Sequence, residues 1–154
     1  MVGQESNFFH AIARNQILWA AIISWALAQG SKIVSGLIKE HKFDFRWIMG
    51  SGGMPSSHSA GVSGLATAVG LQQGFDSLVF ATTFIFALVI MFDAQGARRM
   101  AGMQAKRLNR LIEDLYLNRG ITEERLRELI GHTPVEVLMG ALLGIAAAIV
   151  VMTS

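Results

Sequence analysis

Residues 78–91 form a run without a charged side chain, Leu78-Val-Phe-Ala-Thr-Thr-Phe-Ile-Phe-Ala-Leu-Val-Ile-Met91. The nearest charged residues on either side are Asp76 and Asp93. A helix with this sequence is apolar on every side instead of along one stripe, which is typical of a helix surrounded by lipid. With its uncharged neighbours the run is long enough to cover most of a hydrocarbon layer of about 30 Å. It therefore predicts a transmembrane helix.

Three other stretches are similarly poor in Asp, Glu, Lys and Arg, and the first of them is interrupted only by Lys32. Each offers roughly 16–20 residues, close to the length that a membrane-spanning helix needs. We therefore predict four spans, at about residues 16–38, 56–73, 76–96 and 134–153. Because Glu5 precedes the first stretch and the apolar sequence resumes after Lys32, we expect this span to be retained instead of cleaved as a signal peptide.

The composition agrees with a membrane protein. Of the 154 residues, 52% are hydrophobic and 16% are charged, whereas average soluble domains carry about 25% charged residues. The length suits a single domain over residues 1–154, and the lack of cysteine excludes a disulfide scaffold and a thiolate metal site. We predict an all-α integral membrane helical bundle of about four transmembrane helices plus an amphipathic helical loop. Four buried helices of a soluble bundle are the alternative, disfavoured because the third and fourth stretches lack an amphipathic pattern.

Small residues recur at helical spacing in two of the predicted spans. The second span carries Ser57, Gly61, Gly64 and Ala68, and the fourth contains the segment Gly140-Ala-Leu-Leu-Gly144. Small side chains let helix backbones approach closely in lipid. We expect both patterns to mark helix–helix contacts.

The basic residues are divided unequally between the two predicted membrane faces. With four crossings the chain ends share one face, where Arg14 is the only Lys or Arg outside the spans. The opposite face has eleven: Lys39, Lys42, Arg46, Arg98, Arg99, Lys106, Arg107, Arg110, Arg119, Arg125 and Arg127. Because cytoplasmic loops are enriched in Lys and Arg, we predict a multi-pass protein of the plasma or inner membrane with this second face in the cytoplasm.

The long connection at residues 97–131 is expected to be helical. Apolar residues recur at roughly helical spacing from Ala97 to Leu117, Asn118-Arg-Gly120 interrupts the pattern, and a short second helix is expected from Glu123 to Ile130. Such a helical loop can lie on the membrane surface among lipid headgroups. A nucleic-acid-binding element is disfavoured, because acidic residues dilute the basic face.

Polar residues of the types that take part in catalysis and anion binding gather where the predicted spans meet the basic face. They are Lys39 and Arg46 after the first span, Ser56, Ser57 and His58 at the start of the second, Arg98 and Arg99 after the third, and His132 and Glu136 at the start of the fourth. Ionisable residues at membrane spans suggest a functional site by default. The sequence therefore predicts one polar site at one end of the bundle.

This residue set fits an anion site with two histidines. The glycine-rich segment 50–53 leads into a helix N-terminus, whose backbone N–H groups and dipole favour a phosphate. Ser56 and Ser57 add hydroxyl donors, and the cations neutralise the phosphoryl oxygens. His58 and His132 supply the proton-handling and nucleophilic groups of phosphoryl transfer. Glu136, one turn after His132, is placed to orient its imidazole as the acid of a catalytic triad does.

Purely structural roles remain open for the same residues. Thr133-Pro-Val-Glu136 matches a capping box with proline at the first helical position, and Ser56 or Ser57 is a good helix N-cap. The basic residues would also serve as anchors at the membrane interface. A metal site through His58, His132 and Glu136 is disfavoured, because the surrounding cations oppose a second positive centre.

These segments resemble the motifs of the type 2 phosphatidic acid phosphatase and vanadium haloperoxidase superfamily. Its first motif is Lys, six residues, then Arg-Pro; Lys39 and Arg46 keep this spacing, with Trp47 in place of proline. Its second motif is Pro-Ser-Gly-His, and here Pro55-Ser-Ser-His58 differs at the glycine.

The third motif of the superfamily is Ser-Arg, five residues, His, three residues, Asp. His132 and Glu136 match its second half, with glutamate for aspartate, whereas Arg98 or Arg99 lies more than thirty residues upstream of the histidine. The segments Phe92-Asp-Ala-Gln-Gly-Ala-Arg-Arg99 and Gly131-His-Thr-Pro134 resemble more closely a small divergent membrane branch, described as acid phosphatase/vanadium-dependent haloperoxidase-related. This resemblance covers nearly the whole chain.

The resemblance implies a membrane phosphatase that needs neither metal nor other cofactor. His132 would form a phosphohistidine and His58 would protonate the leaving group. The phosphoryl oxygens would be held by Lys39, Arg46, Arg98 or Arg99, Ser56 and backbone amides. The substrate would be amphiphilic, a lipid phosphate or a polyprenyl diphosphate.

The altered motif positions leave a second function open, a catalytically degenerate membrane protein that binds anionic headgroups or partner proteins. Lipid phosphatases of the superfamily also have six core helices, against the four predicted here. The remaining walls of the site would then come from the helical loop or from a second subunit of a homo-oligomer.

Overall fold

The computed structural model describes residues 2–40, 53–116 and 131–154, and every regular element in these ranges is a helix. The helices are α1 (Val2–Ala13), α2 (Gln16–Glu40), α4 (Ser57–Gln73), α5 (Leu78–Gln95), α6 (Ala97–Tyr116) and α7 (Pro134–Thr153). The predicted all-α membrane bundle is confirmed.

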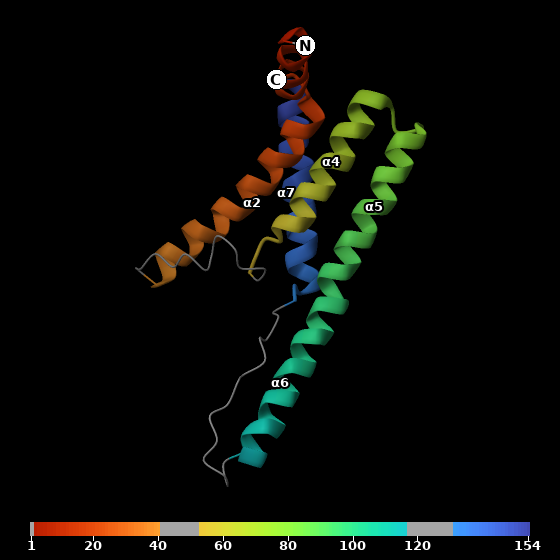
Figure 1. The fold of residues 1–154 in the computed structure, drawn as a ribbon. Coiled ribbons are helices and arrows are strands. Elements are labelled where there is room, and N and C mark those ends of the chain that lie inside the picture. Colours follow the sequence, from red (N-terminus) through yellow and green to blue (C-terminus); the bar gives the residue numbers. More distant parts are fainter. Residues whose placement is uncertain (1, 41–52, 117–130) are drawn as a thin grey trace.

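Helix α4 lies at the centre of the bundle, where it packs against α2, α5 and α7 (Figure 1). Helices α4 and α7 run in the same direction, whereas α2 and α5 run the opposite way. The two chain termini consequently lie together at one end of the bundle. The starts of α4 and α7 lie at the other end, on the side of the junction of α5 and α6, whereas the end of α2 extends away from the bundle.

The interior of the bundle is made of small residues, and the large apolar side chains point outward. Ala20, Ala68 and Ala148 form a fully buried cluster, while Leu78 and Phe92 are 82% and 73% exposed. A water-soluble protein buries its large apolar residues and exposes few large patches of them. Outward apolar side chains around a core of small residues are instead the arrangement expected in lipid.

The small-residue stripe of α4 forms the seam with α2. A Cβ atom at Gly64 would collide with the side chain of Ser24, and one at Gly61 would lie at van der Waals distance from Cβ of Trp25. Ser57 bonds to α2 at one end of the stripe, and Ala68 packs on Ala20 near the other. The close contact expected from this stripe is therefore present.

The glycine pair of α7 forms the seam with α4. A Cβ atom at Gly140 would collide with the backbone of Ser56, and one at Gly144 with the carbonyl of Ala60 and the hydroxyl of Ser63. Ser63 Oγ also donates a hydrogen bond to the carbonyl of Ala141 at 3.0 Å. Glycine is required here because the backbones themselves are in contact.

Three segments of the described residues are long and apolar enough to cross a membrane, Gln16–Ile38, Leu78–Ile112 and Pro134–Thr153. Helix α4 has 17 residues and is surrounded by the other helices. A crossing by α4, and with it the count of four spans, stays a prediction.

Helix α6 covers the segment for which the sequence predicts an amphipathic helix. It continues beyond α5 with only Gly96 between them, and it extends away from the bundle (Figure 1). Its apolar side chains include Met100 and Leu111, each 58% exposed. The predicted short helix from Glu123 to Ile130 lies outside the described residues.

Candidate functional site

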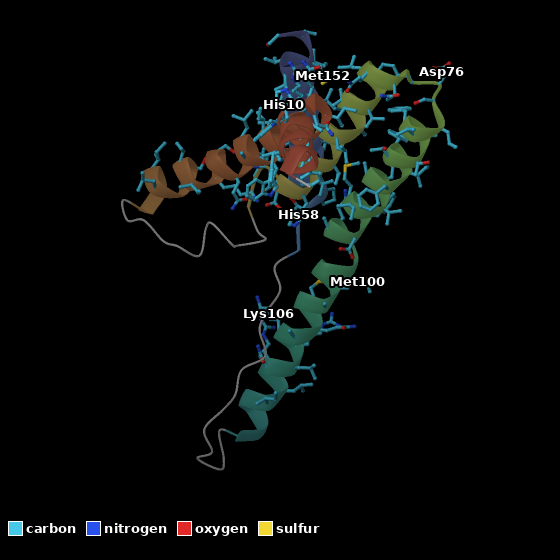
Figure 2. All side chains as sticks on the ribbon, turned by 45° about the horizontal axis from the view of Figure 1, so that its top comes forward. His10, His58, Asp76, Met100, Lys106 and Met152 are labelled. Atoms are coloured by element: carbon cyan, nitrogen blue, oxygen red, sulfur yellow. The ribbon has the colours of Figure 1, made fainter. Side chains whose placement is uncertain are left out.

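The predicted site residues of α4 and α7 meet at the end of the bundle opposite the termini. Figure 2 shows His58 at this end, away from His10 and Met152. Two backbone hydrogen bonds tie the elements together there. The N–H of His132 donates to the carbonyl of Ala94 in α5 at 3.0 Å, and the N–H of Ser56 donates to the carbonyl of Glu136 at 2.9 Å. The site therefore has a backbone frame built from three helices.

His132 lies just before α7 and is only 2% exposed. Its Nδ1 is 3.2 Å from Oε2 of Glu136, one helical turn further on. Because a carboxylate only accepts hydrogen bonds, this contact places a proton on Nδ1. In the neutral ring, Nε2 is then the nitrogen with the lone pair. This is the tautomer that a nucleophilic or basic imidazole requires.

Glu136 also closes the capping box at the start of α7. Its Oε2 accepts a hydrogen bond from the N–H of Thr133 at 2.9 Å, and its own N–H donates to Thr133 Oγ1 at 3.3 Å. The capping role and the orienting role are therefore not alternatives. One carboxylate oxygen serves both, and the cap holds the carboxylate where it meets the imidazole.

His58 contributes a second imidazole to this end of the bundle. It is the second residue of α4 and is exposed, in contrast to His132. The two ring centroids are 6.4 Å apart, and the ring planes are inclined by 58°. A buried imidazole and an accessible one thus lie side by side on two different helices.

The two serines before His58 are held by bonds within the protein. Ser56 is fully buried and caps α4, its Oγ accepting bonds from the N–H and the hydroxyl of Ser59 at 3.3 and 3.0 Å. Ser57 is 3% exposed; its hydroxyl donates to Gln29 Oε1 at 2.5 Å and accepts from Lys32 Nζ at 2.7 Å. Contact of either serine with a phosphate stays a prediction.

Gln29 and Lys32 of α2 are members of this cluster that the sequence pattern does not single out. In the sequence Lys32 reads as an interruption of an apolar stretch. Gln29 and Lys32 are three residues apart and therefore share one helix face, which is the signal that could have found them. Lys32 is half-buried and interacts electrostatically with Glu136.

Of the cations predicted for the site, the structure describes the backbone position of three and leaves out the fourth. Lys39 is in the last turn of α2, and Arg98 and Arg99 are in the first turn of α6, but their side chains are not described. Arg46 lies outside the described residues. The first turn of α6 directly follows the turn of α5 that binds His132 through Ala94. The arginine half of the third motif, remote in sequence, is thus next to its histidine half in space.

Two apolar cavities lie beside α5 in the bundle. One of about 250 Å³ lies between the end of α5 and the start of α7, with Phe92 and Pro134 in its wall. A second of about 370 Å³ lies further along, beside Phe84. Met91 and Ala141 line both, so the two are adjacent. Within the described parts of the chain, no three His, Cys, Asp or Glu side chains converge as metal ligands would.

Comparison with known proteins identifies a family and a relative that is a membrane protein. The sequence profile of a family described as the divergent PAP2 family matches residues 13–147. The uncharacterized membrane protein YuiD of Bacillus subtilis (strain 168) is 43% identical over 144 residues, which cover 85% of this chain and 88% of YuiD. No solved structure matches the chain. The chain is a membrane protein that belongs to the divergent PAP2 family.

Proposed function

We propose that the protein is a membrane phosphatase that cleaves a phosphate monoester or diphosphate through a phosphohistidine at His132. The observation that supports this most directly is the buried imidazole of His132, held by Glu136 at 3.2 Å beside the accessible imidazole of His58. Phosphoryl transfer through histidine needs one imidazole as nucleophile and a second group that transfers the proton. The pair supplies both.

In the first step, Nε2 of His132 attacks phosphorus and the bond from phosphorus to the leaving oxygen breaks. His58, entering protonated, gives its proton to that oxygen. Glu136 stabilises the positive charge that develops on the ring of His132. In the second step, water attacks the phosphohistidine, His58 takes one proton from the water, and inorganic phosphate leaves. Both imidazoles then have their starting protonation states.

The phosphoryl oxygens need several positive partners during this reaction. We assign them to Lys39, Arg46 and one of Arg98 and Arg99, together with N–H groups in the first turn of α4. The first N–H groups of a helix have no partner within the helix, and the dipole there favours an anion. The reaction would then proceed without a metal ion or other cofactor.

An amphiphilic substrate fits the surroundings of this site. The polar cluster lies at the end of the bundle opposite the termini, and Pro134, two residues after His132, lines the nearer of the two apolar cavities. A phosphate headgroup at His132 would leave its hydrocarbon chain to follow α5. We therefore place the substrate among lipid phosphates and polyprenyl diphosphates, with membrane lipid as the surrounding medium.

The division of basic residues, eleven against one, supports placing this site on the cytoplasmic side. The chain has no cysteine, so single cysteines can report the orientation. Gln104→Cys in α6 should be protected from a membrane-impermeant maleimide in intact cells, and Ser154→Cys should be labelled. The reverse pattern would overturn the orientation.

The catalytic proposal is tested by phosphate release from a panel of lipid phosphates and polyprenyl diphosphates in detergent micelles. His132→Ala should abolish release, and acid-labile phosphate should be trapped on the native chain only. His10→Ala is a matched control, because His10 is an exposed histidine on α1, far from the site. Unchanged turnover in His132→Ala would refute the mechanism. Binding of phosphate without hydrolysis of any substrate would favour the headgroup-binding alternative.

A further inference from the structure

We infer that Lys32 is a substrate-binding residue of this site, a cation that contacts the phosphoryl group from within the first span. Gln29 and Ser57 act as its positioning residues. The inference rests on the proposed function for the identity of the substrate. It concerns a residue outside the motifs that carry the family resemblance.

The location of Lys32 is the first reason. It lies in α2, within the segment Gln16–Ile38 that is long and apolar enough to cross a membrane. A cation in such a segment is energetically costly and is rarely present without a partner or a function. A lysine that only reduced this cost would extend its side chain toward the membrane surface. Lys32 instead directs its ammonium group to the buried hydroxyl of Ser57 on α4.

The hydrogen bonds around Lys32 have a defined direction. Ser57 gives its hydroxyl proton to Gln29 Oε1 at 2.5 Å, so its oxygen presents lone pairs to the ammonium of Lys32 at 2.7 Å. An ammonium group has three donors, and this bond uses one of them. Ser57 and Gln29 thus hold the nitrogen in place, and within the described residues the bond to Ser57 leaves the ammonium with donors for an anion.

The position of the ammonium matches the place where a phosphate would bind. Ser57 is the first residue of α4 and directly precedes His58, so Lys32 Nζ is held at the N-terminus of this helix. Through this bond the ammonium lies beside the turn of α4 that carries His58, whose ring centroid is 6.4 Å from that of His132. An anion there would meet the helix dipole and the ammonium together.

Orthovanadate, an analogue of the phosphoryl group, is the probe for this inference. Lys32→Met keeps the length of the side chain and removes its charge. We expect it to weaken vanadate binding and raise KM about 10- to 100-fold, as for loss of a hydrogen bond to a charged group. Lys32→Arg should recover part of the affinity. Lys106→Met on α6 is a charge-matched control away from the cluster and should bind vanadate as the native chain does.

Chemical rescue separates a binding role from a packing role. In this cysteine-free chain, Lys32→Cys can be modified with 2-aminoethyl methanethiosulfonate, which adds an ammonium group, or with the uncharged ethyl reagent. The binding role predicts that vanadate affinity returns with the aminoethyl reagent only and is lost again on reduction. Equal effects of the two reagents, or native affinity in Lys32→Met, would overturn the inference. If Lys32→Met does not fold, the reagent pair still decides between the roles.

The two proposals fail in different ways. If the Lys32→Met variant hydrolyses the substrates as well as the native chain does, the inference is refuted and the phosphatase proposal stands. A native chain that hydrolyses nothing, but binds vanadate in a Lys32-dependent way, would refute hydrolysis and support Lys32 as an anion-binding residue.

Discussion

The two ends of the bundle are built from the same three helices and differ in what those helices bury. Near the termini, α2, α4 and α7 meet through Ala20, Ala68 and Ala148, which are fully buried. At the opposite end the same helices bury polar groups, including Ser57 and His132. Small residues keep the backbones close at both ends, so the difference lies in the side chains and not in the packing mode.

This comparison indicates a division of labour along the bundle axis. The alanine contacts near the termini bring no side-chain polar atoms that need partners, so we expect that end to contribute to stability. The site end buries polar side chains that need partners, and its serine hydroxyls find them in caps and in bonds between helices. We expect substitutions at the two ends to separate activity from stability.

Glu136→Gln should have the largest effect, and it acts on activity. Glutamine can still complete the capping box, but it cannot stabilise a positive imidazole as a carboxylate does. We expect kcat to fall by about 10²- to 10⁴-fold, as when the acid of a catalytic triad is replaced. The readout is phosphate release together with thermal unfolding in detergent micelles.

Thr133→Ala is the matched control for that substitution. It removes the hydroxyl that accepts from the N–H of Glu136 and leaves the carboxylate in place. It should cost about 1 kcal/mol of stability, as for loss of an N-cap. Its kcat should stay at the native value. A loss of kcat in Thr133→Ala as large as that in Glu136→Gln would mean that Glu136 acts only through the cap.

Gly144→Ala should have the next largest effect, and it acts on stability. The added Cβ would meet the carbonyl of Ala60, so α7 would have to move away from α4. We expect a loss of about 1–3 kcal/mol in the free energy of unfolding. Gly30→Ala in α2 is the control: no atom lies within 4 Å of the new Cβ, and helix propensity favours alanine by about 0.5–1 kcal/mol. Equal stabilities of the two variants would contradict the close α4–α7 contact.

Ser63→Ala should have the smallest effect. It removes the bond from Ser63 to the carbonyl of Ala141, and hydrogen bonds between helices in membranes contribute about 0.6 kcal/mol on average. Vanadate affinity should not change, because Ser63 is more than one turn beyond His58 in α4 and its hydroxyl bonds to the carbonyls of Ala60 and Ala141. Ser57→Ala, which removes the anchor of Lys32, should lower that affinity with a similarly small loss of stability. If the two serines behaved alike, the site end would not differ in function from the middle of the α4–α7 contact.

Much of the fold and part of the site could be predicted from local sequence patterns. The apolar run at 78–91, the stripe through Gly64 and the pair Gly140 and Gly144 each depend on spacing within one helix, and helical periodicity determines which residues share a face. The contact between His132 and Glu136 is local too, because His132 directly precedes Thr133, the N-cap to which Glu136 bonds.

The rest of the site depends on how the helices align with one another. Lys32 belongs to the cluster only because the antiparallel packing of α2 and α4 brings it beside Ser57, 25 residues away in sequence. The first turn of α6, with Arg98 and Arg99, is near His132 only because the loop before α7 bonds to Ala94. No local pattern encodes such an alignment, because it results from side-chain packing between separate helices.

The sequence by itself determined that this chain is a helical membrane protein. It also determined at which small residues the helices can approach closely, and that Glu136 lies near His132. These properties follow from hydrophobicity and from spacing within single helices, which are local quantities. Only the tertiary structure decided that Gln29 and Lys32 of α2 join the histidines. Those contacts arise from the relative positions of helices, and the close packing of small residues sets these positions.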